Sequence, residues 1–88
     1  MKENELEKLF KAIANRRRIL IIRLLKKNKE MVVGDVAKAI KLSFKSTSKH
    51  LLILHGAGII EKDQRSSLMF YHINNDLSKT ISAVVSIL

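Results

Sequence analysis

Hydrophobic residues recur at intervals of three and four along the first third of the chain, which is the spacing of one face of an α-helix. This pattern predicts a first helix from about Glu3 to Ala14, whose apolar positions are Leu6, Leu9, Phe10 and Ile13. A second helix is expected from about Arg16 to Lys27, with Asn15 separating the two. Lys26 and Lys27 suit its end, because cations stabilise the negative end of a helix dipole.

The middle of the chain predicts two short helices joined by a tight connection. Met31–Val33 is apolar and β-prone, and it leads into a helix expected at Gly34–Ile40. Ser43 is a good N-cap for a further helix that runs through about His55 and ends at the flexible Gly56–Gly58 segment.

The last third of the chain predicts a β-hairpin and a final helix. Strands are expected at Ile59–Lys62 and Leu68–Ile73, joined by the polar segment Asp63–Ser67. Asn74 or Asn75 is expected to cap a helix over Asp76–Leu88. The complete order of elements is that of a winged helix-turn-helix, a mainly α (α+β) fold with about five helices and a two-stranded hairpin wing. In that fold the helix after the tight turn lies in the major groove of DNA.

Length and charge narrow the functional class. With 88 residues, 47% of them hydrophobic, the chain is expected to form a single domain over residues 1–88. The net charge of +9 indicates a polyanionic partner, and nucleic acid is the first candidate. Residues 1–30 carry a net charge of +6 and residues 31–56 carry +3, whereas the remainder is neutral, so the first two thirds should face the anion.

Several stretches of the chain also resemble one known family. Three stretches are similar to segments of the ArsR-type (arsenic-repressor) family of small winged-helix transcriptional repressors. They are LFKAIANRRRILIIRLL, EMVVGDVAKAIKLSFKSTSKHLLILHGAGII and MFYHIN. The most specific part is a colinear set comprising Ala14, Asn15, Arg18, Leu42, Ser43, Ser48, His50, Leu51, Leu54, Ala57 and Gly58. The resemblance covers roughly Leu6 to Asn74 and implies a homodimeric, sequence-specific regulator of double-stranded DNA, most simply a repressor that occupies an inverted-repeat operator.

The chain departs from the family pattern at four places. Val32 and Gly34 stand where metal-sensing members carry two cysteines, and the final segment from Asp76 has one acid and no histidine for the family's other metal site. Arg16 replaces a family proline, and Phe44 occupies a usually polar position at the start of the recognition helix.

Polar side chains of the predicted recognition helix and wing are the candidate DNA contacts. Side chains in the first turns of such a helix reach base edges and phosphates, and an arginine at a wing tip enters a narrow minor groove. A solvated polar face is the alternative for each of these positions. The candidates are Lys45, Ser46, Ser48, Lys49, Gln64, Arg65, Arg16 and Arg17, whereas Arg18 matches a family arginine with a structural role.

The sequence predicts no metal site, no cofactor and no catalysis. His50 and His55 are about 140° apart around a helix and so do not converge on one ion, and His72 lies on a predicted strand. The chain has no cysteine, and it shows no arrangement of paired carboxylates, nucleophile with base, or phosphate-binding loop. No effector is indicated.

The apolar face of the last helix predicts a homodimer interface with the first helix, although closing the protomer core is the alternative. The residues expected there are Leu6, Phe10, Ile13, Leu77, Ile81, Val84 and Leu88. A twofold dimer would place two recognition helices about one DNA turn apart.

Two rival functions remain at the level of sequence. The first rival is a basic amphipathic module that binds a membrane surface or a protein partner, since the segment KLFKAIANRRRILIIRLLKKNK resembles such a helix. Asn15 and the three consecutive arginines interrupt its apolar face. A winged helix that binds RNA or a protein is the second rival, weakened by the few aromatic residues. The longest apolar runs have four residues and the start MKENELE has no signal-peptide pattern, so we expect a cytoplasmic protein.

Overall fold

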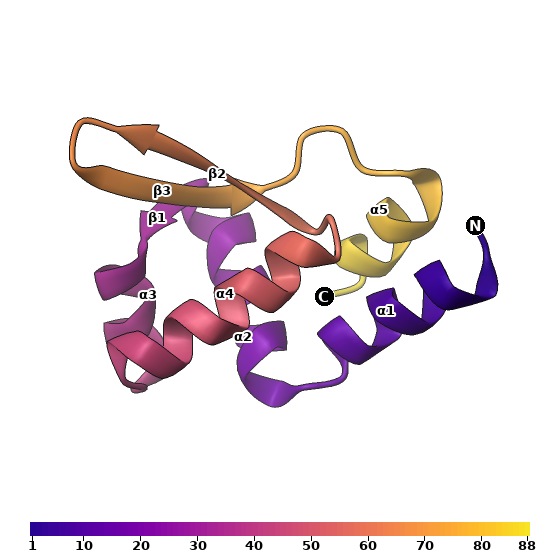
Figure 1. The fold of residues 1–88 in the computed structure, drawn as a ribbon, viewed down its shortest axis with the longest axis horizontal. Helices are drawn as coiled ribbons and strands as arrows, with labels where there is room; N and C mark the ends of the chain where they lie inside the picture. The colour runs from indigo at the N-terminus through magenta and orange to yellow at the C-terminus, as the bar shows by residue number, and fades with distance from the viewer.

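The computed structural model describes residues 1–88 as five helices and a three-stranded antiparallel sheet. Figure 1 shows the hairpin β2–β3 projecting from one end of the molecule, with α1 and α5 at the other. The elements, in chain order, are α1 (Glu3–Ile13), α2 (Arg16–Asn28), β1 (Glu30–Val32), α3 (Val33–Ile40), α4 (Phe44–Gly56), β2 (Ile60–Arg65), β3 (Leu68–Ile73) and α5 (Lys79–Ser86). The winged helix-turn-helix predicted from the sequence is therefore confirmed.

The core lies where α2 and α4 pack against the other helices and the base of the sheet. Apolar side chains from the five helices and from the start of β2 are buried there, and partly buried side chains of β1 and β3 pack against them. The largest of those that are almost completely buried are Leu9, Ile21, Ile22, Leu25, Leu51, Leu54, Ile59 and Ile60. Burying each such side chain contributes about 1.5–3 kcal/mol, so this cluster fixes α4 against the body of the protein.

The first two helices are separate elements, as the sequence predicted. Asn15 lies between them with an extended backbone, and its side chain accepts a hydrogen bond from the amide of Arg18 at 3.1 Å. This N-cap ends any continuous helix at Ala14. The rival interpretation of this segment as one continuous amphipathic helix is therefore wrong. No helix in the structure is long and apolar enough to cross a bilayer.

The sheet has one strand more than the predicted two-stranded wing. β1 pairs antiparallel with β3, and the strand order is β1-β3-β2. Met31 lies opposite Tyr71, and both pack against the core. Periodicity marked this segment as β-prone but could not identify its partner, because β1 and β3 are about forty residues apart in the sequence.

The hairpin is longer and its turn tighter than the sequence suggested. β2 continues to Arg65, which pairs with Leu68, so only Ser66 and Ser67 form the connection. Ser66 has a left-handed backbone with φ of 58°. The polar run from Asp63 was predicted as a loop, yet ladder hydrogen bonds to β3 hold Asp63–Arg65 in the strand, because tertiary pairing overrides weak strand propensity.

The last helix is shorter than predicted, and its N-cap is Ser78 rather than Asn74 or Asn75. The hydroxyl of Ser78 accepts from the amide of Ile81 at 3.3 Å. The amide group of Asn74 is already used, because it accepts from the amide of Asp76 and donates to the carbonyl of Gly58, at 2.9 and 3.0 Å. Asn74 thus forms a turn that anchors the loop between β3 and α5 to the end of α4.

Candidate nucleic-acid interface

Helix α4 buries one face and leaves the opposite one in solvent. Its N-cap is Ser43, as predicted, and the hydroxyl accepts from the amide of Ser46 at 3.1 Å. Thr47, Leu51 and Leu54 are completely buried. Since these three residues occupy one side of the helix, the exposed Lys45 and Lys49 are held on the other side, away from the core. Ser46 and Ser48 are half-buried at the flanks.

Arg18 fixes the orientation of α4 relative to α1 and α2. Its Nε donates to the carbonyl of Ala12 at 2.5 Å and Nη2 donates to that of Lys11 at 3.1 Å, while Nη1 lies 3.1 Å from Nδ1 of His50 on α4. Because arginine has no acceptor, His50 must accept here through an unprotonated nitrogen. Burial, followed by the charges of Arg18 and Arg17, lowers the pKa of His50 below its ordinary value of 6.5. The structural role expected for Arg18 matches this geometry.

The other predicted arginines of α2 lie near the start of that helix. Arg16 is exposed, and Arg17 is half-buried with an Nη1 atom that has no hydrogen-bond partner. The N-cap Asn15 sets their position, and Arg17 lies close enough to affect the pKa of His50. Arg17 therefore adds positive charge beside α4, and neither Arg16 nor Arg17 forms an ion pair with an acidic side chain.

The two predicted wing residues point to opposite faces of the hairpin. Gln64 belongs to the same face as Ile60, which is buried against the core, whereas Arg65 belongs to the other face. The Arg65 guanidinium lies 3.7 Å from the centre of the Phe70 ring and 2.6 Å from the carboxylate of Glu30. Arg65 is thus at the wing tip, as the sequence indicated, but it is already paired within the protein.

Three exposed residues of α4 and β2, namely Phe44, Leu52 and Lys62, were not among the DNA contacts predicted from the sequence. Lys62 is exposed and shares its strand face with Gln64, on the side of the sheet that packs toward the helices. Strand alternation from Ile60 would have identified it. Phe44 and Leu52 on α4 are each 64% exposed, and only their departure from the usual amphipathic pattern marks them.

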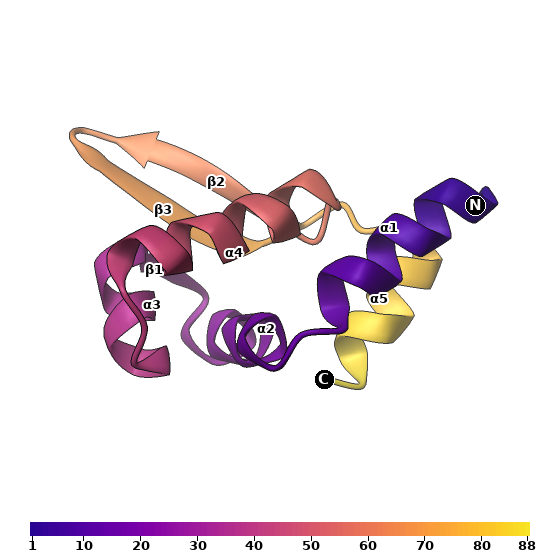
Figure 2. The ribbon, with the colours of Figure 1, turned by 60° about the horizontal axis from the view of Figure 1, so that its bottom comes forward.

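The residues predicted for a dimer interface, in and around α1 and α5, differ in how far the protomer buries them. Figure 2 shows the two helices together at the end of the molecule opposite the wing tip. Ile13 is buried within the protomer, because α1 turns Leu9, Ala12 and Ile13 toward the core together. Phe10 is 54% exposed, as an interface residue should be, and Leu6 is half-buried. The predicted side chains in α5 and on either side of it are half-buried against the core, namely Leu77, Ile81, Val84 and Leu88.

Comparison with known proteins identifies the family. The model of bacterial regulatory proteins of the arsR family matches residues 15–62, which span α2, the helix-turn-helix and the first half of β2. The chain belongs to the arsR family of regulators. It is 34% identical over 77 residues to the uncharacterized HTH-type transcriptional regulator MJ1325 of Methanocaldococcus jannaschii, a match covering 88% of this chain and 86% of that protein.

Other relatives have named regulatory roles. The chain is 36% identical over 66 residues to the transcriptional repressor SdpR of Bacillus subtilis, covering 75% of this chain and 72% of SdpR. It is 31% identical over 80 residues to the transcriptional activator HlyU of Vibrio cholerae, covering 91% of this chain and 70% of HlyU. These family members are transcriptional regulators and not enzymes.

Solved structures share the whole fold. HlyU from Vibrio cholerae superposes with a TM-score of 0.81 at 29% identity, over 99% of this chain and 92% of that chain. Mb0332 of Mycobacterium bovis, described as a homodimeric winged helix-turn-helix DNA-binding domain, superposes with a TM-score of 0.82 at 24% identity, over 96% of this chain and 74% of that chain. Because these matches cover 96–99% of this chain, the shared fold includes α1 and α5 as well as the helix-turn-helix.

The thiolate positions of metal-sensing family members are filled here by other residues. Val32 ends β1 and Gly34 lies in the first turn of α3, and neither offers a metal ligand. The histidines also lie apart: His55 faces Glu61 at 4.0 Å and His72 faces Asp63 at 3.0 Å, while His50 is bound to Arg18. No three side chains of His, Asp or Glu converge to hold a metal ion.

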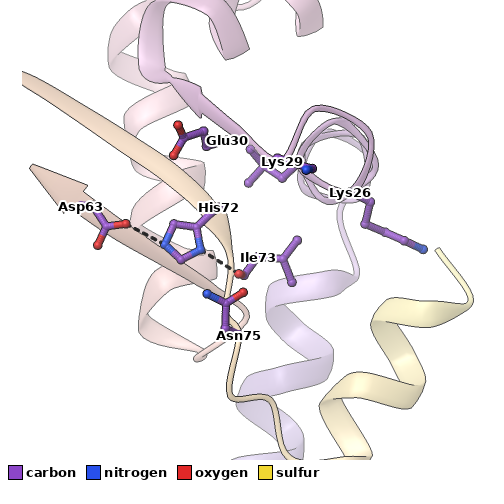
Figure 3. A pocket seen from close by; sticks show the side chains of 8 residues that line it. Lys26, Lys29, Glu30, Asp63, His72, Ile73 and Asn75 are labelled. Atoms are coloured by element: carbon purple, nitrogen blue, oxygen red, sulfur yellow. Dashed lines mark hydrogen bonds and ion pairs between the residues drawn. The ribbon is translucent and has the colours of Figure 1, made fainter. Parts of the chain in front are cut away.

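An open pocket of about 660 Å³ lies between the end of α2 and the outer face of the sheet (Figure 3). Most of its charged groups are already paired. His72 bridges Asp63 and the carbonyl of Ile73, and Glu30 binds Arg65. Lys26 donates to the carbonyls of Val85 and Ser86, and thereby ties the end of α5 to α2. These contacts brace the sheet and α5 against the body of the regulator.

Proposed function

We propose that this protein is a homodimeric transcription regulator that binds a short inverted repeat in double-stranded DNA and represses by occupying a promoter. The observation that carries the proposal is the exposed Lys45–Lys49 face of α4, held outward by three completely buried residues on the opposite side. A helix held in this way fits the major groove, because its position is fixed before DNA arrives.

The proposed contacts divide into base readout and phosphate binding. Lys45, Ser46, Ser48 and Lys49 lie in the first two turns of α4, where side chains reach base edges. Arg16 and Arg17 would meet phosphates beside α4, and the wing would contribute Gln64, Arg65 and the neighbouring Lys62. No acidic side chain lies on α4, so the positive charges act together.

The proposed dimer joins the α1 and α5 ends of two protomers. Phe10 on α1 and Ile87 beyond α5 are 54% and 79% exposed, and large exposed apolar side chains of this kind mark protein interfaces. Mb0332, which shares the fold, is described as homodimeric, and this is in keeping with a dimer of this chain. Twofold symmetry would then present two copies of α4 to two half-sites.

Repression is the simpler direction of regulation for this architecture. Occupying a promoter requires only the DNA-binding surface and the dimer, whereas activation requires a further contact with the transcription machinery. Both directions occur among the relatives, since SdpR is named a repressor and HlyU an activator.

Selection of random duplex DNA with the purified protein tests the proposal. We expect an enriched inverted repeat, and Lys49→Ala should weaken its binding by about tenfold, as expected for loss of a base contact worth 1–3 kcal/mol. Lys79→Ala on α5 is the matched control and should change the affinity little. Recovery of no common sequence, or preference for single-stranded RNA or lipid vesicles over duplex DNA, would refute the proposed function.

A further inference from the structure

The exposed face of α4 carries two parallel rows of side chains. Residues four apart are neighbours along a helix, so Phe44, Ser48 and Leu52 form one row. Lys45, Lys49 and Ile53 form the row beside it. The outer surface of the recognition helix is therefore apolar at both ends of one row, and the other row carries two lysines followed by the exposed Ile53.

Phe44 and Leu52 have no structural task within the protomer. Each is 64% exposed, and neither belongs to the core or to the side chains packed around it. The buried side of α4 is already filled by other residues, so these two large apolar groups remain in water. Exposed apolar groups that line up on one face indicate a surface that is covered when a partner binds.

The charge around this row indicates which partner covers it. The neighbouring row places Lys45 and Lys49 alongside, the positive end of the helix dipole lies at Phe44, and α4 contains no acidic residue. The partner must therefore be polyanionic and must also offer apolar groups between its charges. The major groove of DNA fits both requirements, because thymine 5-methyl groups line its floor between two phosphate backbones.

We propose that Phe44 and Leu52 read thymine by contacting its 5-methyl group, so that each half-site carries thymine at two positions. The inference rests on the proposed function and adds a specificity to it. Eight residues of α-helix rise about 12 Å, so the two thymine contacts lie about three to four base pairs apart along the groove. The lysines and Ser48 supply the hydrogen bonds and charge contacts between them.

Replacing thymine with deoxyuridine tests the contact, because uracil removes only the methyl group and keeps every hydrogen-bonding group of the base. In the selected duplex, we expect uracil at two positions of a half-site to weaken binding by about fourfold each, as for one lost apolar carbon. Uracil at the other thymines should have little effect.

Variants of the two residues assign each position. At one of the two sensitive positions, Phe44→Ala should bind DNA with thymine and DNA with uracil with equal affinity. At the other position, Leu52→Ala should show the same loss of discrimination. Leu20→Ala, which shortens an exposed apolar side chain on α2, should keep both sensitivities. Thermal melts of the three variants check that the fold is kept.

The outcomes separate this inference from the proposed function. The thymine contact is overturned if uracil at every position leaves the affinity for the duplex unchanged. It is also overturned if Phe44→Ala and Leu52→Ala both keep the full effect of uracil. Either result leaves the proposal of a DNA-binding regulator intact. A protein partner whose binding is lost in Phe44→Ala and Leu52→Ala, with DNA binding unaffected, would assign the apolar row to that partner and also overturn it. Failure to bind any duplex overturns both.

Discussion

Nη2 of Arg65 lies 2.6 Å from Oε2 of Glu30, so the tip of the wing is tied to the strand that precedes α3. The guanidinium also lies over the Phe70 ring, and the bond with Glu30 raises the pKa of Arg65. Both side chains of the ion pair are about half exposed. Because an ion pair between exposed side chains contributes little to stability, a phosphate can compete with Glu30 for Arg65.

Glu30→Gln should therefore tighten binding to the selected DNA by about two- to fivefold, because it removes the carboxylate that competes for Arg65. Fluorescence anisotropy measures the affinity. In an Arg65→Ala background the gain should disappear, and Arg65→Ala alone should reduce the slope of log K against log[salt] by about 2 for the dimer. An equal gain in affinity in the Arg65→Ala background would mean that Glu30 weakens binding only by repelling the DNA phosphates, and not by competing for Arg65.

Thr47→Val should stabilise the protein. Thr47 is completely buried and its hydroxyl oxygen has no hydrogen-bond partner, so a methyl group of similar size removes an unsatisfied polar atom. We expect the free energy of unfolding to rise by about 1 kcal/mol. Thr47→Ser keeps the hydroxyl and loses the methyl group, and should lower the free energy of unfolding by a similar amount. Chemical denaturation at one protein concentration compares them, and a destabilised Thr47→Val protein would contradict this reasoning.

Stability should decrease in mild acid because of His50. Its pKa is below 6.5 in the folded protein, mainly through burial, so the unfolded chain binds the proton more readily. The contribution of neutral His50 is therefore complete above pH 6.5 and is progressively lost as the pH falls from there toward the folded-state pKa. His50→Gln is the reference, because its amide oxygen accepts from Arg18 without titrating. The free energy of unfolding should fall more steeply with acid in the unmodified protein than in His50→Gln. Parallel curves would show that His50 does not control the effect.

The fold could be predicted from sequence to the extent that local signals determine it. The apolar spacing in α1 and α2 and the N-cap Ser43 act within a few residues, and the first four predicted helices begin and end within one or two residues of those in the structure. The pairing of β1 with β3 and of Arg65 with Glu30 joins residues 35 or more apart, which periodicity does not report. The start of α5 was misplaced because Asn74, a good N-cap by type, is bound to Gly58.

In the candidate site, too, local sequence signals predicted some features, whereas others depend on long-range packing. The positions of Lys45 and Lys49 on α4 follow from helix geometry once Ser43 is recognised as the cap. The burial of Ile13 and the exposure of Phe10 depend on how α1 is rotated against α2 and α4, and two neighbouring apolar faces of one helix look alike in sequence.

Phe10→Asp should split the dimer into monomers, because it places an unpaired charge in the proposed α1–α5 interface. Leu68→Asp is the matched control: Leu68 is 51% exposed, close to the 54% of Phe10, but it lies at the wing tip. Sedimentation at micromolar concentration should show dimers for the unmodified protein and for Leu68→Asp, and monomers for Phe10→Asp. A monomeric unmodified protein would rule out the interface.

The affinity for an inverted repeat whose half-sites are moved apart by five base pairs shows whether two copies of α4 bind the same face of the duplex together. Five base pairs are about half a helical turn, so the insertion turns one half-site to the opposite face of the duplex. If two copies of α4 bind together as a fixed dimer, the insertion should weaken binding by about 100-fold or more, and ten inserted base pairs should bring the half-sites back to the same face. Equal affinity for the original repeat and the five-base-pair insertion would contradict the account.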